Sequence, residues 1–324
     1  MTRSWIASLC VLCAFVAWTG PAQPQPKLAR VGVVSPGSPP PGPLEAFRAG
    51  LREAGYVEGR NLQIEWRFAE GRNERLPALI EDLVKARVHV MFVVNTQAAQ
   101  AAKKTAGQIP VVFARVSDPT RTGLVASLSR PGGNMTGISN VADELGAKRI
   151  ETLKTLIPKL SNIAVLWNAG NPGVALILQE LQNASPALRV QIQGVGVGGK
   201  DDFPAAFAAV RASKPQALFV LDDLLITSYR PEILAFAAEQ RLPVMSLYEE
   251  FVENGGLLSY GPSIEGMYRR ASWYVDRILR GAKAGELPVE QPAAFELVIN
   301  LKTAKSLGVN IPGDVLTRAS KVFR

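Results

Sequence analysis

Polar residues that could bind a small molecule stand directly after short apolar segments of this chain. They are Ser35, Asn95, Thr96, Ser117, Asp118, Asn168, Asn171, Asp222 and Tyr248. If the apolar segments are parallel strands, these residues meet at the carboxyl edges of sheets, where open α/β folds bind ligands. Hydroxyl groups and helix N-termini would hold a carboxylate, Asp222 or Asp118 an ammonium group, and Tyr248 would supply an aromatic wall. The set predicts an amino-acid-like ligand.

Several of these residues also have a purely structural interpretation. Asn95, Asn168 and Asp118 are of the types that cap helices and form turns. Thr96 is expected to cap the helix that follows it, whose free N–H groups would favour a carboxylate. Trp167 is assigned to the core in preference to a ligand wall. The sequence leaves open which of the polar residues touch the solute.

The residues of common catalytic centres are missing. His89 is the only histidine, and it lies in the apolar segment Val88–Val94, where we expect a structural role. Both cysteines lie within the first 13 residues, so zinc sites and Ser-His-Asp or Cys-His centres are not expected. Asp222 and Asp223 are adjacent and should point apart, although a hydrolase with a more distant carboxylate pair stays open. Arg115 could pair with a structural carboxylate. We expect no catalytic residue, no metal and no cofactor.

One glycine motif resembles a nucleotide-binding sequence. Gly194, Gly196 and Gly199 match G-x-G-x-x-G after an apolar segment, with Asp222 further along the chain. A dinucleotide site needs these glycines to open the helix directly. Here other residues intervene, and Asp202 is expected to cap the next helix. We interpret the motif as a flexible strand-to-helix loop.

The N-terminus has the order of a secretory leader. A short positive start is followed by the uncharged run 6–18 and then by Gly20-Pro21-Ala22. Residues 1–22 are therefore predicted to be a signal peptide, and the protein to be periplasmic. The net charge is +8, but the Lys and Arg residues are scattered, so nucleic-acid binding is not expected.

Short apolar runs alternate with amphipathic stretches along the rest of the chain. Ten runs are predicted to be strands: Arg30–Val34, Leu62–Trp66, Val88–Val94, Ile109–Ala114, Met135–Ser139, Ile163–Trp167, Arg189–Val195, Ala217–Leu221, Pro243–Leu247 and Leu257–Tyr260. This alternation predicts an α/β fold with two doubly wound parallel-sheet lobes of five strands each. Turn-forming residues near Arg130–Asn140, Tyr260–Ser263 and Gly285–Pro292 mark expected crossings, which would form a multi-strand hinge. A longer helix capped by Ser263 is expected around Ile264–Ile278.

Five segments together resemble a known family. They are AFRAGLREAGYVEGRNLQIEWRFAEG, IPVVFARVSDPTRTGLVASLSRPGGNMTGIS, NIAVLWNAGNPG, LPVMSLYEEFVENGGLLSYGPS and LPVEQPAAFELVINLKTAKSLGVNIP. The chain resembles the ABC-transporter substrate-binding proteins of the type I periplasmic-binding-protein fold, in the subfamily that includes tryptophan-binding proteins. It departs from that pattern at Asp222-Asp223, where a neighbouring proline is expected.

The resemblance implies capture of a small-molecule solute and its delivery to an inner-membrane ABC permease. It also implies discontinuous lobes, with residues 27–136 plus 262–288 in the first and 137–261 plus 289–324 in the second. The expected mechanism is hinge closure by a monomer. An extracytoplasmic ligand sensor of the same fold is the alternative. Transcriptional regulators of this fold carry a DNA-binding helix-turn-helix where this chain has its leader.

Overall fold

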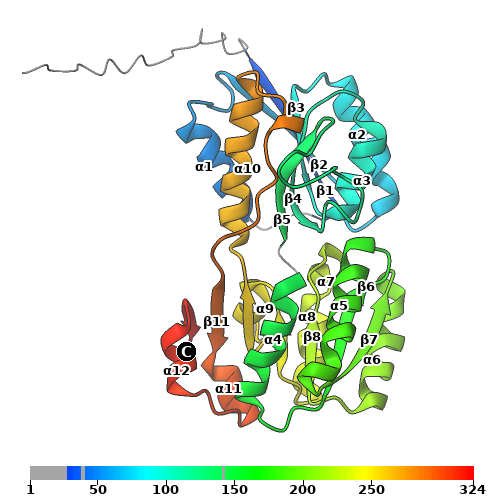
Figure 1. Ribbon diagram of the computed structural model, residues 1–324, viewed down its shortest axis with the longest axis vertical. Helices are drawn as coiled ribbons and strands as arrows, with labels where there is room; N and C mark the ends of the chain where they lie inside the picture. Colours follow the sequence, from blue (N-terminus) through cyan, green and yellow to red (C-terminus); the bar gives the residue numbers. More distant parts are fainter. Residues whose placement is uncertain (1–27, 38–40, 141–142) are drawn as a thin grey trace, which may run out of the picture.

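The computed structural model describes residues 28–37, 41–140 and 143–324. The predicted signal peptide, residues 1–22, lies outside them. The described chain forms two stacked α/β lobes, each built around its own sheet (Figure 1). The predicted fold class, two doubly wound parallel-sheet lobes, is confirmed.

The first sheet has, within the described residues, five parallel strands in the order β2-β1-β3-β4-β5. Its strands are β1 (Ala29–Ser35), β2 (Leu62–Phe68), β3 (Val90–Val94), β4 (Val111–Ser117) and β5 (Met135–Asn140). Every residue of β3 and β4 is buried, as expected for continuous apolar strands that are covered on both faces. Its flanking helices are α1 (Pro41–Glu53), α2 (Leu76–Lys85), α3 (Thr96–Thr105) and α10 (Ile264–Leu279).

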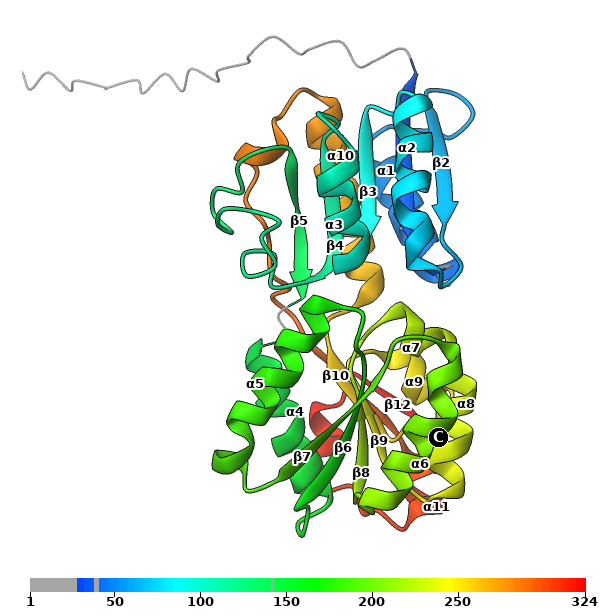
Figure 2. The ribbon, with the colours of Figure 1, turned by 90° about the vertical axis from the view of Figure 1, so that its right-hand side faces the viewer.

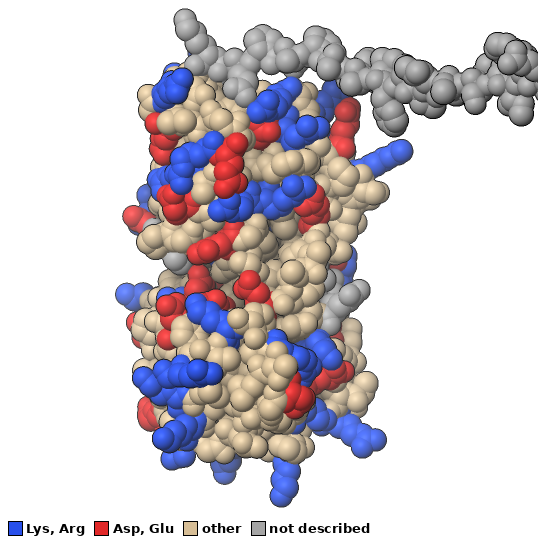
Figure 3. Space-filling model, turned by 90° about the vertical axis from the view of Figure 1, so that its left-hand side faces the viewer, with Lys and Arg blue, Asp and Glu red and all other residues tan. Residues whose placement is uncertain are grey.

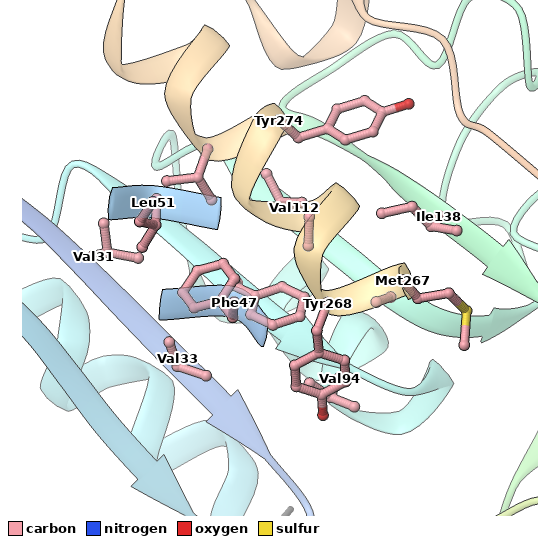
Figure 4. Packing of buried hydrophobic residues seen from close by; sticks show 14 of the residues in the cluster. Val31, Val33, Phe47, Leu51, Val94, Val112, Ile138, Met267, Tyr268 and Tyr274 are labelled. Atoms are coloured by element: carbon pink, nitrogen blue, oxygen red, sulfur yellow. The ribbon is translucent and has the colours of Figure 1, made fainter. Parts of the chain in front are cut away.

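Helix α10 belongs to this first lobe although it follows the strands of the second in the chain. It lies beside α1 and covers β3, β4 and β5 (Figure 1). The ring of Phe92 is stacked on Phe47 with centroids 4.8 Å apart, and Tyr268 meets it edge-on at 5.2 Å. Figure 4 shows Tyr268 and Met267 of α10 packed among residues from β1 to β5. The predicted helix is confirmed, and Ser263 Oγ accepts a hydrogen bond from Gly266 N.

In the part of the chain that the structure describes, the second sheet has seven strands in the order β12-β11-β10-β9-β8-β6-β7. They are β6 (Asn162–Asn168), β7 (Gln191–Val197), β8 (Ala217–Val220), β9 (Val244–Ser246), β10 (Leu258–Gly261), β11 (Glu296–Asn300) and β12 (Lys321–Phe323). The helices of this lobe are α4 (Asp143–Leu156), α5 (Pro172–Leu188), α6 (Phe203–Ser213), α7 (Leu224–Ser228), α8 (Arg230–Glu239), α9 (Glu249–Glu253), α11 (Leu301–Leu307) and α12 (Gly313–Arg318). Single 3₁₀ turns complete the description: η1 (Asn73–Arg75), η2 (Lys200–Asp202) and η3 (Ala284–Glu286).

The ten predicted strands are present, with limits shifted by up to three residues. The expectation of five strands in the second lobe is wrong, because β11 and β12 extend its sheet and β11 runs antiparallel to β10. The capping role predicted for Thr96 is also wrong: Asn95 is the N-cap of α3, and its side chain accepts from Ala98 N. His89 has the expected structural role, since its Nδ1 accepts a hydrogen bond from Arg30 N.

The chain passes between the lobes after β5, after β10 and again before β11. The first and last of these passages are hydrogen-bonded to each other. Glu290 N donates to Gly137 O, and Ser139 N donates to Glu290 O, both at 2.9 Å. Arg270 of α10 holds the same residue through its side chain, with two bonds of 2.7 and 2.5 Å to the Glu290 carboxylate. The lobe limits stated above stay a proposal.

Gly137 permits the close pairing of β4 and β5. Its φ is +149°, and an added Cβ would lie 2.0 Å from Phe113 O. We expect Gly137→Ala to lower the free energy of unfolding by at least about 2 kcal/mol and the thermal midpoint by roughly 4–8 °C. Calorimetry measures both. Gly199→Ala is the matched control, since no atom lies within 4 Å of its added Cβ. Equal midpoints for the two variants would contradict this account.

The Arg270–Glu290 pair should make stability depend on pH. The hydrogen bonds from Arg270 lower the pKa of Glu290 below its ordinary 4.5. The pair therefore contributes stability above pH 4.5, and the contribution is lost as the pH falls through the lowered pKa. Both side chains are about two-fifths exposed, so screening limits the contribution to about 0.5–1 kcal/mol. Urea titrations should show Glu290→Gln less stable than wild type at pH 7, with a gap that shrinks in acid. A gap that is constant across that range would refute the assignment.

Candidate functional site

The carboxyl ends of the first sheet face the second lobe. Figure 2 shows the arrowheads of β2, β3 and β5 directed toward it. In that gap the lobes touch directly: Gln97 Nε2 of α3 donates to Gly170 O at 3.1 Å, and Arg121 pairs with Glu180 of α5. The candidate site is built from strand-end residues of both lobes that meet here.

Arg115 reaches the second lobe from an irregular position of β4. The register between β4 and β5 shifts between Phe113 and Val116, and Arg115 itself has φ +58°. Its Nη2 donates to Asp222 Oδ1 at 2.5 Å, and its guanidinium lies 4.7 Å from the centroid of the Tyr248 ring. The side chains of Arg115 and Asp222 are only 2% and 9% exposed. A buried ion pair therefore joins the two lobes.

The charges of this pair depend on each other. Burial raises the pKa of the Asp222 carboxyl, while the Arg115 guanidinium acts in the opposite direction. Burial also raises the pKa of Tyr248, which stays neutral and donates from its hydroxyl to Asn140 Oδ1 at 3.1 Å. Removal of either charged partner would leave the other charge buried without compensation. The contact between the lobes thus depends on both members of the pair.

Asp223 organises the loop beside Asp222, and the two side chains point apart as expected. Its carboxylate accepts hydrogen bonds from Asn168 Nδ2 at 2.7 Å, Asn171 Nδ2 at 2.8 Å and Leu225 N at 2.8 Å. Asn171 also caps α5. The amide donors of both predicted asparagines are thus bonded to Asp223, and these residues fix the shape of the loop that carries Asp222.

The predicted residues of the first lobe are also tied to local structure. Thr96 Oγ1 accepts from Ser117 N at 3.2 Å, which joins the ends of β3 and β4. Asp118 accepts from Arg121 N at 2.8 Å within a turn. Ser35 is fully buried, and its Oγ has no hydrogen-bond partner among the described residues. Asn95 is engaged as the cap of α3.

Sequence reasoning missed Arg149, which is 2% exposed on α4. Its Nε donates to Tyr260 O at 2.6 Å, and Asp222 and Tyr248 both act on its pKa. A signal was present: Arg149 stands four residues after Leu145 and four before Leu153, so it lies on the buried stripe of a helix. Tyr268 of α10 packs against Phe92, and it also lies within reach of the Arg115 charge.

The gap between the lobes is nearly closed in this structure. A cavity of 10 Å³ remains beside Asp222, Tyr248 and Phe251. A larger cavity of 420 Å³ opens on the hinge side of Tyr248, and Lys321 lines it together with acidic residues. Figure 3 shows acidic side chains at the waist of this face. The residues that line the smaller cavity all come from the second lobe, whereas the larger cavity is lined from both lobes. We assign the ligand gap to the smaller space, because Asp222 and Tyr248 beside it contact the buried Arg115 of the first lobe. A solute must therefore enter while the lobes are apart.

Comparisons with known proteins agree on one family. The family described as ABC transporter substrate binding protein matches residues 43–323. A tyrosine-binding protein of Clostridioides difficile (strain R20291) is 28% identical over 264 residues, which are 81% of this chain and 75% of that protein.

Solved structures agree as well. An ABC domain from Streptococcus pneumoniae in complex with L-Trp is 26% identical, with a TM-score of 0.86 over 91% of this chain and 100% of that one. A conserved domain protein of Vibrio cholerae is 28% identical, with the same TM-score and the same coverage of both chains. A 5-methylthioribose transporter solute binding protein of Thermotoga lettingae is 16% identical with a TM-score of 0.60 over 90% of this chain and 97% of that one, which shows the shared fold.

The buried ion pair should control how far the lobes open. We expect Arg115→Met to shift the ligand-free protein toward an open arrangement, because opening lets water reach the unpaired Asp222 carboxylate. The free-energy difference between the open and the closed arrangement should change by more than about 2 kcal/mol. Spin labels on cysteines placed at the exposed positions Lys104 and Asn183 would measure the distance between the lobes.

Arg121→Met is the matched control. Arg121 also pairs with an acid of the other lobe, but its side chain is 44% exposed. Its replacement should therefore change the free-energy difference between the open and the closed arrangement by less than about 1 kcal/mol. An equal response of the two variants would contradict a special role for the buried pair.

Proposed function

The chain belongs to the ABC transporter substrate binding protein family, and from this premise we propose that it captures a small amino-acid-like solute between its lobes and delivers it to an inner-membrane permease. Proteins of this family bind solutes outside the cytoplasm. The observation that carries the proposal is the buried contact of Arg115 and Asp222 from opposite lobes, over the ring of Tyr248. A ligand that bonds to both lobes at this point would close the gap.

An amino acid fits the chemistry of this gap. Asp222 offers a carboxylate for an ammonium group, and Arg115 a guanidinium for a carboxylate. The Tyr248 ring adds an aromatic face. The relatives support the same class, since one is named a tyrosine-binding protein and another is solved with L-Trp. The proposed ligand-binding set remains Ser35, Asn95, Thr96, Ser117, Asp118, Asn168, Asn171, Asp222 and Tyr248.

The proposed mechanism is closure about the hinge. A solute that contacts both lobes binds the closed form better and raises its population by that difference in affinity. A shift from 1% to 99% closed needs about 5.5 kcal/mol of differential binding. Such a difference is within the reach of two charge-assisted contacts and one buried aromatic face. The closed surface would then dock on the permease.

We propose a periplasmic, monomeric binding protein without enzymatic activity. None of the helices in the described ranges 28–37, 41–140 and 143–324 has the length and apolar content needed to cross a lipid bilayer. The predicted leader would direct export. Uptake of the solute by cells would separate transport from sensing. A transport protein should support uptake in a wild-type strain but not in a strain that lacks the permease.

Ligand screening tests this function. Free amino acids at about 100 times the dissociation constant should stabilise the protein by about 2.7 kcal/mol and raise its thermal midpoint. Small-angle scattering should show a smaller radius of gyration with ligand than without it. Sugars and nucleosides serve as controls. A midpoint shift with these compounds but with no amino acid, or no compaction at saturating ligand, would reject the proposal.

A further inference from the structure

Two buried arginines share one acid at the candidate site. Asp222 accepts the hydrogen bond of Arg115. Among the described side chains, it is also the carboxylate whose charge favours the charged form of Arg149. The phenols of Tyr248 and Tyr260 also lie near Arg149. Burial lowers the pKa of Arg149 to about 10. This is the direction expected for a buried cation that lacks an anion of its own.

Arg149 stands where the second lobe meets the first. Its Nε is bonded to Tyr260 O at the end of β10, where the chain leaves for the first lobe. Its Nη2 has no hydrogen-bond partner within the described chain, and the same holds for Arg115 Nε and the Tyr268 hydroxyl. All three groups lie within electrostatic reach of Asp222. Glu250 acts on Arg115 and Tyr268 as well, whereas Asp222 is the acid that acts on Arg149.

Buried donors of this kind require an acceptor. A guanidinium is planar and matches a carboxylate with two parallel hydrogen bonds, whereas an ammonium group or a sugar hydroxyl offers no such complement. A purely structural arginine would be expected to use its donors on backbone carbonyls or on an acid. Arg149 uses Nε in this way and leaves Nη2 free. A carboxylate is the acceptor that suits this free donor best.

We propose that Arg149 binds the carboxylate of the solute. This inference rests on the proposed function and narrows its ligand class to molecules with a carboxylate. A zwitterion has a partner for each kind of charge in the gap: its ammonium group takes Asp222, and Arg115 is released to share the ligand carboxylate with Arg149. The ligand thus breaks the ion pair between Arg115 and Asp222, and each of these residues pairs with a charged group of the ligand instead.

Three probes that share an indole ring separate the two ends of the ligand. L-tryptophan has both charged groups, indole-3-propionate has only the carboxylate, and tryptamine has only the ammonium group. Calorimetric titration of wild type should show that tryptamine binds about tenfold to a hundredfold more weakly than L-tryptophan. In Arg149→Met, the affinity for L-tryptophan should fall by about tenfold, and its advantage over tryptamine should shrink by the same factor, because Arg115 still reaches the carboxylate.

Two further variants guard against a general loss of structure. Arg149→Lys keeps the charge but loses the two-pronged geometry, so it should recover part of the preference for the carboxylate. Arg211→Met, at an exposed guanidinium 5.7 Å from the Phe236 ring in the second lobe, should bind all three probes as wild type does. The ligand-free Arg149→Met protein should unfold at a midpoint no lower than wild type, because a buried unpaired charge is removed.

The outcomes separate this inference from the proposed function. L-tryptophan binding that is unchanged in Arg149→Met, or tryptamine binding as tight as L-tryptophan, overturns the role of Arg149 and leaves the proposed function standing. Native mass spectrometry of wild type identifies any solute that copurifies. A retained carboxylate that is not an amino acid and is lost in Arg149→Met rejects the amino-acid class but supports Arg149. A retained solute without a carboxylate, or no binding of any kind, overturns the inference.

Discussion

A charge removed from water must meet an opposite charge or several hydrogen bonds, or the fold loses more free energy than it can spare. Arg115 and Asp222 satisfy this condition only when the lobes are together, because each lies on a different lobe. Local features on both sides keep them in place. The irregular register of β4 positions Arg115, and the hydrogen bonds of Asp223 shape the loop that carries Asp222. The arrangement of the lobes follows from this requirement.

Much of the fold could be predicted because parallel strands leave a clear pattern. A strand that is covered on both faces must be apolar throughout, as in Val90–Val94. Such a short continuous apolar run is easy to recognise in a sequence. Strand β12 carries no such pattern, since its three residues lie at a sheet edge and none is buried. Strand β11 is apolar, but its antiparallel pairing with β10 depends on the path by which the chain returns to the second lobe. Local sequence does not encode that path.

The candidate site was harder to predict than the sheets that carry it. The rule for strand ends located Asp222 and Tyr248 correctly at the gap, but it could not distinguish a free side chain from one already bonded. Asn168 and Asn171 are bonded to Asp223, more than fifty positions away in the chain. Arg149 lies within helix α4 and not at the end of a strand, so the rule passed over it. The glycine motif has a packing role: an added Cβ at Gly194 would lie 2.8 Å from Leu178, and one at Gly196 would lie 3.3 Å from the Trp167 ring.

The late position of α10 in the chain has a consequence for the order of events during folding. The rings of Phe47 and Phe92 are made early, but Tyr268, which completes their cluster, follows only after nearly all of the second lobe. Until residue 279 has left the ribosome, the first sheet lacks the cover of one face and exposes apolar strands. The first lobe therefore cannot complete its core before α10 has been made, and by then strands β6 to β10 of the second lobe are already available to pair.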